Sequence, residues 1–138
     1  MAQPDPGPFA GVEVGQRLGP VTFAVSGTAN ERYWAAAGVE HPLRAAGALY
    51  PPMAANLTIL LFQTVYPRPM LQTTQRLVCH QRADADQTLS VTGMVAQRYE
   101  KRDREYAVIQ AVIALEDRSP LWTSIVTFTE AGVSARSG

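Results

Sequence analysis

Glu40 and His41 are adjacent residues whose side chains, a carboxylate and an imidazole, are suited to acid/base chemistry. An imidazole titrates close to neutral pH, and a carboxylate can accept and return a proton, so the pair is chemically adequate for moving protons to and from water. Adjacent side chains usually point apart, and a shared water would need an unusual backbone at this point. The pair is therefore either a catalytic pair or two ordinary polar residues of an exposed turn before Pro42.

Arg44 and Asn56 are two further residues that could contact a substrate. An arginine can clamp a phosphate or a carboxylate with paired hydrogen bonds, although it can equally be a surface charge. An asparagine within an apolar segment can orient a substrate carbonyl or a water, or it can satisfy a neighbouring backbone group. Both are candidate substrate-binding residues, with the structural alternative left open.

Other reactive residues do not form a recognisable site. Cys79 and His80 are neighbours in a predicted strand, where their side chains point to opposite faces and cannot act as nucleophile and base. Two histidines, one cysteine and scattered carboxylates have no metal-ligand spacing, so no metal is expected. Residues 15–20 lack the lysine and hydroxyl of a phosphate-binding loop and precede a strand instead of a helix.

The composition limits the class of protein and its partners. The 138 residues amount to one domain that can bury a core without disulfides. Basic and acidic residues both number 12, so no broad basic surface for nucleic acid is expected. The most apolar stretch, residues 53–62, is much shorter than the roughly 20 residues of a membrane-spanning helix. No secretory signal is recognisable at the N-terminus, and one cysteine favours a cytoplasmic location, away from membranes.

The first half of the chain predicts a strand followed by a helix. A flexible proline-rich arm is expected at residues 1–8, a single domain at residues 9–132 and a frayed tail at residues 133–138. Within the domain, a short strand covers residues 21–25. The helix after it begins at a capping box formed by Thr28 and Glu31, and it ends at Gly38.

A second predicted helix is apolar on nearly every side. It covers residues 51–66, because Pro51 and Pro52 suit a first turn and Pro67 prevents continuation. The segment carries no charge, and such a helix must be surrounded by other structure.

The second half has the alternating pattern of β-strands. Period two runs over residues 88–95 and 106–115, with further strands expected at residues 71–82 and 121–129. Short polar connections between these strands favour antiparallel hairpins. The predicted fold class is therefore α+β with the hotdog architecture, an antiparallel sheet wrapped around a long apolar central helix. Its open edge or flank is expected to be closed by a second copy, as a dimer.

Two stretches of the sequence carry a family resemblance. Residues 9–43, FAGVEVGQRLGPVTFAVSGTANERYWAAAGVEHPL, contain a Val-Gly entry, a strand, a capped helix and a glycine followed by a Pro-Leu turn. Residues 82–95, RADADQTLSVTGMV, are similar to a strand motif of the form P-x-x-x-G-D-T-L-x-x-x-G-x-V. Both stretches resemble the MaoC-like (R)-specific enoyl-thioester hydratases and dehydratases, which have the hotdog fold.

The resemblance also points to an active-site segment. The family motif has the form G-D-x-N-P-[hydrophobic]-H, and its Asp and His flank a catalytic water. Gly38, Pro42 and Leu43 match this motif, whereas the Asp, Asn and His positions hold Val39, His41 and Arg44. The covering segment that follows is short, with only residues 45–50 before the central helix. If the acid/base pair has shifted by one position, Glu40 and His41 are the catalytic candidates.

An acyl-thioester substrate, which the resemblance implies, would need an apolar slot and a donor for its carbonyl oxygen. Candidate lining residues are Tyr33, Trp34, Tyr50 and Met53, and the backbone amides of Met53 and Ala54 could face the thioester oxygen. Core packing explains most of these residues equally well.

Three functions are compatible with the sequence. The first is a hydratase or dehydratase of acyl-CoA or acyl carrier protein thioesters, a reaction that needs water and no cofactor. The second is a non-catalytic hotdog subunit, or a binder of hydrophobic ligands, that pairs with an active paralogue. The third is a lyase or cyclase acting on a polyketide-like substrate. A thioesterase is disfavoured because residues 51–66 contain no acid. The expected assembly is a homodimer or a heterodimer with another hotdog chain.

Overall fold

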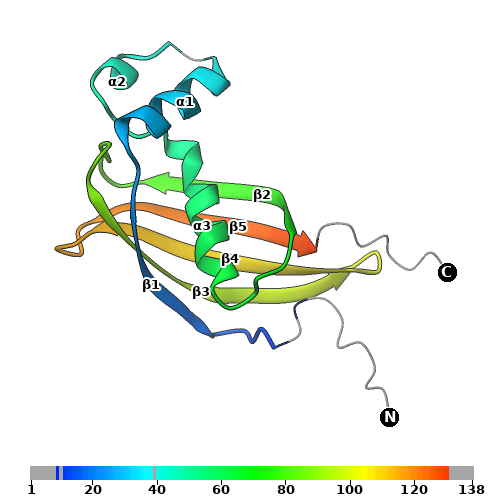
Figure 1. The fold of residues 1–138 in the computed structure, drawn as a ribbon. Coiled ribbons are helices and arrows are strands. Elements are labelled where there is room, and N and C mark those ends of the chain that lie inside the picture. The colour runs from blue at the N-terminus through cyan, green and yellow to red at the C-terminus, as the bar shows by residue number, and fades with distance from the viewer. Residues whose placement is uncertain (1–8, 10, 39, 131–138) are drawn as a thin grey trace.

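A computed structural model describes residues 9, 11–38 and 40–130 of this chain. The predicted arm at residues 1–8 and the predicted tail at residues 133–138 lie outside the described residues. The elements follow one another in the order β1 (Arg17–Ala24), α1 (Gly27–Ala37), α2 (Pro42–Ala45), a 3-10 turn η1 (Pro51–Met53), α3 (Ala54–Gln63), β2 (Met70–Cys79), β3 (Thr88–Lys101), β4 (Arg104–Leu115) and β5 (Pro120–Glu130) (Figure 1).

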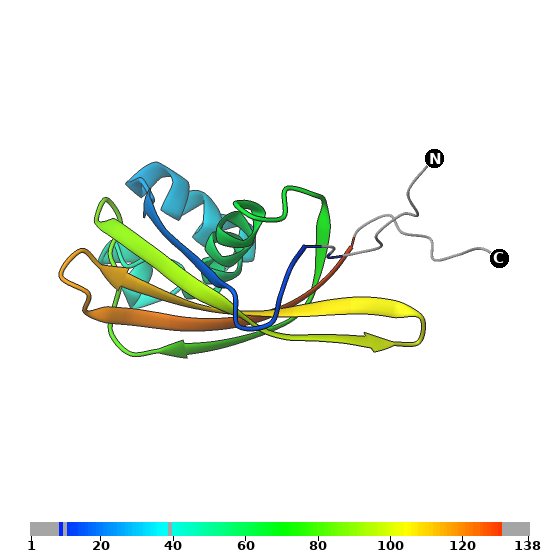
Figure 2. The same ribbon diagram turned by 90° about the horizontal axis from the view of Figure 1, so that it is seen from below.

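The five strands form one antiparallel sheet in the order β1-β3-β4-β5-β2. The sheet curls around α3, which lies across its inner face (Figure 2). Alternate residues of β4, among them Ile109 and Ile113, are fully buried on the helix side, as period-two patterning requires. The predicted hotdog architecture is therefore confirmed.

The central helix is shorter than the sequence pattern predicts. Residues 51–53 form the 3-10 turn η1, and α3 itself ends at Gln63 instead of residue 66. Leu57, Leu61 and Phe62 are buried against the sheet, but Leu60 is 47% exposed on the opposite side. The sheet therefore covers one side of α3, and a stripe that includes Leu60 is left open on the other.

Helix α1 begins earlier than its predicted capping box. Its N-cap is Ser26, whose Oγ accepts a hydrogen bond from the amide of Ala29 at 3.1 Å. Thr28 lies inside the helix, and Glu31 contacts Arg44 instead of the helix start. The predicted end at Gly38 is confirmed, because this residue adopts the left-handed conformation that closes many helices.

Two glycines allow α3 to approach the sheet closely. A Cβ atom added to Gly93 would lie 2.6 Å from the carbonyl oxygen of Gln110 and 2.9 Å from Cδ2 of Leu61. A Cβ atom at Gly19 would lie 2.6 Å from the carbonyl oxygen of Val91 and 3.0 Å from Cδ1 of Leu61. Leu61 therefore sits in a notch that only residues without side chains can form. We call Gly19 and Gly93 the glycine notch.

A buried carboxylate closes the far end of the core. The hydroxyl of Tyr66 donates to Glu130 at 2.9 Å and accepts from the amide of Phe9, and Arg68 pairs with the same carboxylate. Burial, with the adjacent Glu130, raises the pKa of Tyr66. Phe9 is fully buried against Tyr66 and Phe62, so the cluster anchors the start of the described chain.

The glycine notch predicts that Gly93→Ala destabilises the protein. The added methyl group must displace either backbone or Leu61, and overpacking of this kind costs about 1–3 kcal/mol. Chemical denaturation measures the change in the free energy of unfolding. Gly27→Ala is the matched control, because a Cβ atom there meets only Asp86 at 3.6 Å. Equal stabilities of the two variants would contradict the notch.

Candidate functional site

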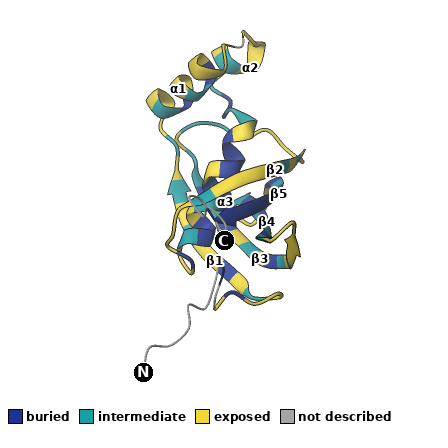
Figure 3. Cartoon of the chain, turned by 90° about the vertical axis from the view of Figure 1, so that its right-hand side faces the viewer, coloured by how far each residue is buried: buried dark blue, intermediate teal, exposed yellow. Residues whose placement is uncertain are grey.

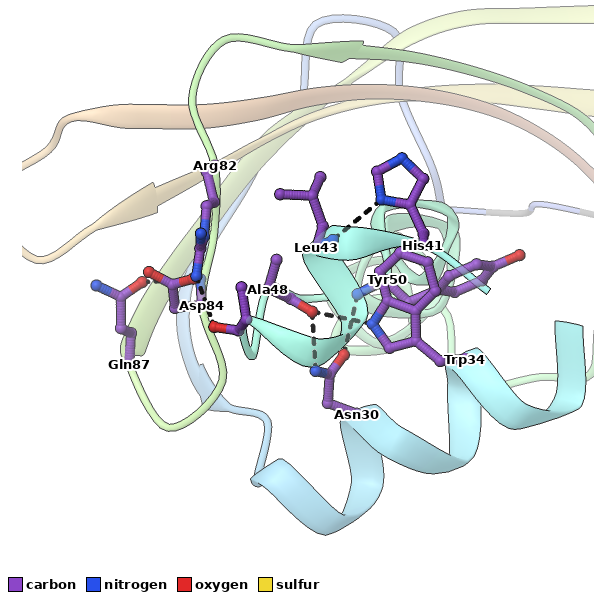
Figure 4. Close-up of polar contacts among 10 residues, drawn as sticks. Asn30, Trp34, His41, Leu43, Ala48, Tyr50, Arg82, Asp84 and Gln87 are labelled. Atoms are coloured by element: carbon purple, nitrogen blue, oxygen red, sulfur yellow. Dashed lines mark hydrogen bonds and ion pairs between the residues drawn. The ribbon is translucent and has the colours of Figure 1, made fainter. Parts of the chain in front are cut away.

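The segment between α1 and α3, here called the overhang (residues 40–50), is held by a shared backbone acceptor. The carbonyl oxygen of Ala48 accepts hydrogen bonds from Asn30 Nδ2 and Trp34 Nε1, both at 2.9 Å. The side-chain oxygen of Asn30 accepts from the amide of Tyr50 at 3.0 Å. Asn30 and Trp34 are one helical turn apart on α1, so one face of α1 fixes the overhang (Figure 4).

The opposite side of the overhang is pinned to the segment after β2. The amide of Leu49 donates to the carbonyl of Ala83 at 2.8 Å, and the amide of Ala85 donates to the carbonyl of Gly47 at 3.0 Å. Arg82 adds hydrogen bonds to the carbonyl of Ala46 at 2.7 Å and to Asp84 at 2.5 Å. The overhang is thus fixed from both sides, at the end of the molecule where α1 and α2 stand away from the sheet (Figures 1 and 3).

His41 caps the short helix α2 through one of its ring nitrogens. Nδ1 accepts a hydrogen bond from the amide of Leu43 at 3.1 Å, and the ring stacks on Trp34 with centroids 6.1 Å apart. A neutral imidazole that accepts at Nδ1 carries its proton on Nε2. His41 therefore has Nε2 left to interact with a substrate or a water.

Glu40 and Arg44 lie on the outer surface of the overhang. The Glu40 side chain is 97% exposed, with Oε1 3.7 Å from Arg44 Nη1. Arg44 also pairs with Glu31, Nε lying 2.8 Å from the carboxylate, and this hydrogen bond holds the pKa of Glu31 below its usual value. Arg44, a candidate substrate clamp from sequence, thereby ties α2 to α1.

Tyr33 and Asn56 are brought together by the fold. Asn56 Nδ2, in the first turn of α3, donates to the hydroxyl oxygen of Tyr33 on α1 at 3.0 Å. Because the tyrosine oxygen acts as the acceptor, its own proton can be offered to another group. Asn56 is exposed and Tyr33 is half-buried, so the pair is accessible from outside.

The remaining predicted binding residues pack into the fold. Trp34 is buried and meets the edge of the Tyr50 ring at 5.1 Å. Met53 and Ala54 are also buried. Their amides, which could have faced a thioester oxygen, donate to the carbonyls of Tyr50, Pro51 and Pro52. The geometry lends no support to a substrate-binding role for Met53 and Ala54, which stays a sequence-based prediction.

Asn30 is the residue of this region that sequence reasoning missed. It is 4% exposed, and its amide bonds both to Ala48 and to Tyr50. The available signal was its position four residues before Trp34, which places two side chains with hydrogen-bonding groups on one helix face. Their common target, a carbonyl 18 residues from Asn30 in the chain, could not be read from that spacing.

A pocket of about 340 Å³ opens beside the overhang. Residues of the overhang form one wall, and residues 79–83 with Trp122 form the other.

Among the described residues, no group of three or more His, Cys, Asp or Glu side chains could hold a metal ion. Within the same residues, no helix has both the length and the apolar character to span a membrane.

Comparison with solved structures identifies chains of the same fold. The HadBC (3R-hydroxyacyl-ACP dehydratase) complex of Mycobacterium tuberculosis matches with a TM-score of 0.73 and 16% identity, over 84% of this chain and 96% of the solved chain. The (R)-hydratase of A. caviae involved in PHA biosynthesis matches with a TM-score of 0.67 and 15% identity, over 86% and 96%. The MaoC-like dehydratase of Rhodospirillum rubrum matches with a TM-score of 0.65 and 15% identity, over 86% and 92%.

Sequence comparison identifies no such relative. No family model matches this chain, and no curated protein is significantly similar to it in sequence. The fold is therefore that of MaoC-like dehydratases and (R)-hydratases, and it is carried by a divergent sequence.

The double role of Asn30 predicts that Asn30→Ala destabilises the overhang. The variant leaves the amide of Tyr50 without its partner and removes one of the two donors to Ala48, at a cost of about 1–3 kcal/mol in the free energy of unfolding. Hydrogen exchange should show faster opening at residues 48–50. Thr28→Ala, at an exposed position of the same helix, is the control. Unchanged protection at residues 48–50 in Asn30→Ala would rule out this anchoring role.

Proposed function

We propose that this chain acts on acyl thioesters, of CoA or of acyl carrier protein, as a hotdog protein of hydratase/dehydratase type. The observation that supports the proposal most is the fold it shares with (R)-hydratases and dehydratases. The overhang between α1 and α3 is held in place by hydrogen bonds, and it carries the carboxylate of Glu40 and the imidazole of His41.

In the proposed hydration, Glu40 is the base and His41 orients the water. The Glu40 carboxylate takes a proton from water as the water oxygen bonds to C3 of the enoyl thioester. The resulting carboxylic acid returns a proton to C2, so the carboxylate is regenerated and one water has been added. His41, with its proton on Nε2, donates a hydrogen bond to the water oxygen. Dehydration is the same sequence in reverse.

The Tyr33–Asn56 pair is the proposed contact for the thioester carbonyl. Asn56 holds the tyrosine oxygen by donating to it, which leaves the hydroxyl proton to bond the carbonyl oxygen. Such a donor stabilises the negative charge that develops on this oxygen when water attacks C3.

Replacement of the acid/base pair by similar groups tests the catalytic assignment. Glu40→Gln removes the base, and His41→Asn removes the imidazole while keeping a good N-cap for α2. The double variant should hydrate crotonyl-CoA at least about 100-fold more slowly than the wild type, the usual scale of acid/base assistance. Glu116→Gln, at an exposed position on the connection between β4 and β5, is the control. A wild-type rate in the double variant would contradict the roles of Glu40 and His41.

Tyr33→Phe tests the carbonyl contact separately. The phenyl ring keeps the packing of Tyr33 but loses the hydroxyl group. Loss of one oxyanion donor lowers kcat by about 100-fold at preorganised sites, and for this half-buried pair we expect at least a tenfold fall with little change in the melting temperature. Tyr99→Phe, on the distant β3–β4 hairpin, is the matched control. A lower melting temperature with unchanged kcat would show that the pair only joins α1 to α3.

A second candidate function is a non-catalytic subunit that pairs with an active hotdog chain. Two observations favour it. The candidate base Glu40 is highly exposed beside Arg44, and the candidate imidazole of His41 already has a structural role as the cap of α2. Strand β2 lies at the edge of the sheet and is exposed over most of its length, so it offers an edge for a partner strand (Figure 3). A purified homodimer that hydrates thioesters unaided would contradict this alternative.

A further inference from the structure

The outer face of the sheet points away from α3, and no helix of the described residues covers it (Figure 2). In β4 the odd-numbered residues 107–113 are fully buried on the helix side, so the even-numbered residues point outward. An antiparallel sheet that faces water on one side usually has polar residues at such outward positions. The outward residues of β4 are mostly apolar instead: Tyr106, Val108, Gln110, Val112 and Ala114. This pattern is typical of a sheet face that other structure covers.

A row of residues crosses the outer face from one edge of the sheet to the other and has an arginine at each end. The strand register pairs Arg17 with Met94, Met94 with Gln110, Gln110 with Ile125, and Ile125 with Arg76. Residues paired across strands share a face, so the whole row points outward with Gln110. Neighbouring strands are about 4.8 Å apart, which places the two arginines about 19 Å apart across the sheet. We call these five residues the outer row.

The charges on the outer face all have the same sign. The strands contain three acidic residues, and the register places them on the helix side: Glu100, Glu105 and Glu130. The charged residues of the strands that point outward are all cationic: Arg17, Arg76, Lys101 and Arg104. Because the chain has 12 basic and 12 acidic residues, this face is segregated from the balance of the whole.

The two arginines of the outer row are available for an outside partner. Arg17 and Arg76 are both exposed. Within the part of the chain that the structure describes, neither of them forms an ion pair with a carboxylate. Met94, between them on the row, is 41% exposed. The outer row therefore presents an apolar and uncharged centre between two cations.

The outer face is hollowed beside the outer row. Two hollows of about 410 and 550 Å³ have Pro20, Thr92 and Val112 in common, so they adjoin each other. Three members of the outer row also line the first hollow. Recesses of this kind can receive the side chains that project from a partner surface.

From these observations we infer that the outer face is a docking surface for another protein, whose contact surface is apolar at its centre and acidic at its rim. Carboxylates on that rim would pair with Arg17 and Arg76, and apolar side chains would cover Met94 and the hollows. This surface is separate from the overhang, so the proposal goes beyond the proposed thioester chemistry and does not rest on it.

The charges of the outer face decide between classes of partner. Two copies of this chain that met through their outer faces would bring cations against cations, which is unfavourable. Nucleic acid binds chiefly through phosphates, and the uncharged centre of the face provides no cation to neutralise them. An acidic protein surface matches both the cationic edges and the apolar centre.

Photo-crosslinking from the outer row tests the proposal. Met94 is replaced by p-benzoylphenylalanine in the full chain, the protein is expressed in its source organism, and irradiated adducts are identified by mass spectrometry. We expect an adduct with a protein of net negative charge, at a yield at least about tenfold higher than from the same probe at Leu60. Leu60 is 47% exposed on the open stripe of α3, so it reports contacts on the other side of the sheet.

Three results of the crosslinking would overturn the proposal. The first is a yield from position 94 that does not exceed the yield from position 60. The second is an adduct with a second copy of this chain or with nucleic acid. The third is a partner protein without net negative charge.

Charge reversal at the ends of the outer row tests the role of the arginines. Arg17→Glu and Arg76→Glu should each lower the yield of the adduct from position 94 by at least about tenfold, because each places a carboxylate against the acidic rim. Arg32→Glu, at an exposed position of α1, is the matched control and should leave the yield unchanged. Melting temperatures check that the variants fold, since all three arginines are exposed. Equal yields in the three variants would overturn the proposal.

Discussion

The close seating of α3 on the sheet is the constraint on which the rest of the structure depends. Leu61 occupies the space left by the missing side chains of Gly19 and Gly93, and a buried hydrogen bond from Thr58 to Ser124 joins the same helix to β5. Protein interiors are close-packed, so a helix seated this way cannot shift without opening voids or making clashes. The first turn of α3, which contains Asn56, is consequently held at a fixed distance from the sheet.

The short overhang runs between α1 and the segment after β2, and hydrogen bonds hold it on both sides. The carbonyl of Ala48 takes two hydrogen bonds from α1, while Leu49 and Gly47 bond to the segment after β2. Several polar groups of the region are used in this way: Nδ1 of His41 caps α2, and Arg44 binds Glu31. The groups left for chemistry are correspondingly few: the exposed carboxylate of Glu40, Nε2 of His41 and the hydroxyl proton of Tyr33.

Local signals in the sequence predicted the elements well and their ends less well. The left-handed Gly38 and the prolines at residues 51 and 52 mark boundaries that the structure retains, because they act through backbone geometry alone. The capping box at Thr28 was wrong, since Ser26 begins the helix and a tertiary partner, Arg44, takes the carboxylate of Glu31. A local motif of this kind fails when a more distant charge competes for the same group.

The sequence by itself determined the fold class, because the alternation of apolar residues in the strands and the uncharged central helix permit few ways of burying both. It also singled out the segment around Glu40 and His41. Only the tertiary structure decided which side chains of that segment already have hydrogen-bond or ion-pair partners, and that Asn30 holds the segment in place. It also decided that Tyr33 contacts Asn56 and that Cys79 lines the same pocket as Leu43. The Asn30–Ala48, Tyr33–Asn56 and Leu43–Cys79 pairings join residues at least 18 positions apart in the chain, and such contacts follow from how the elements pack, which no local pattern encodes.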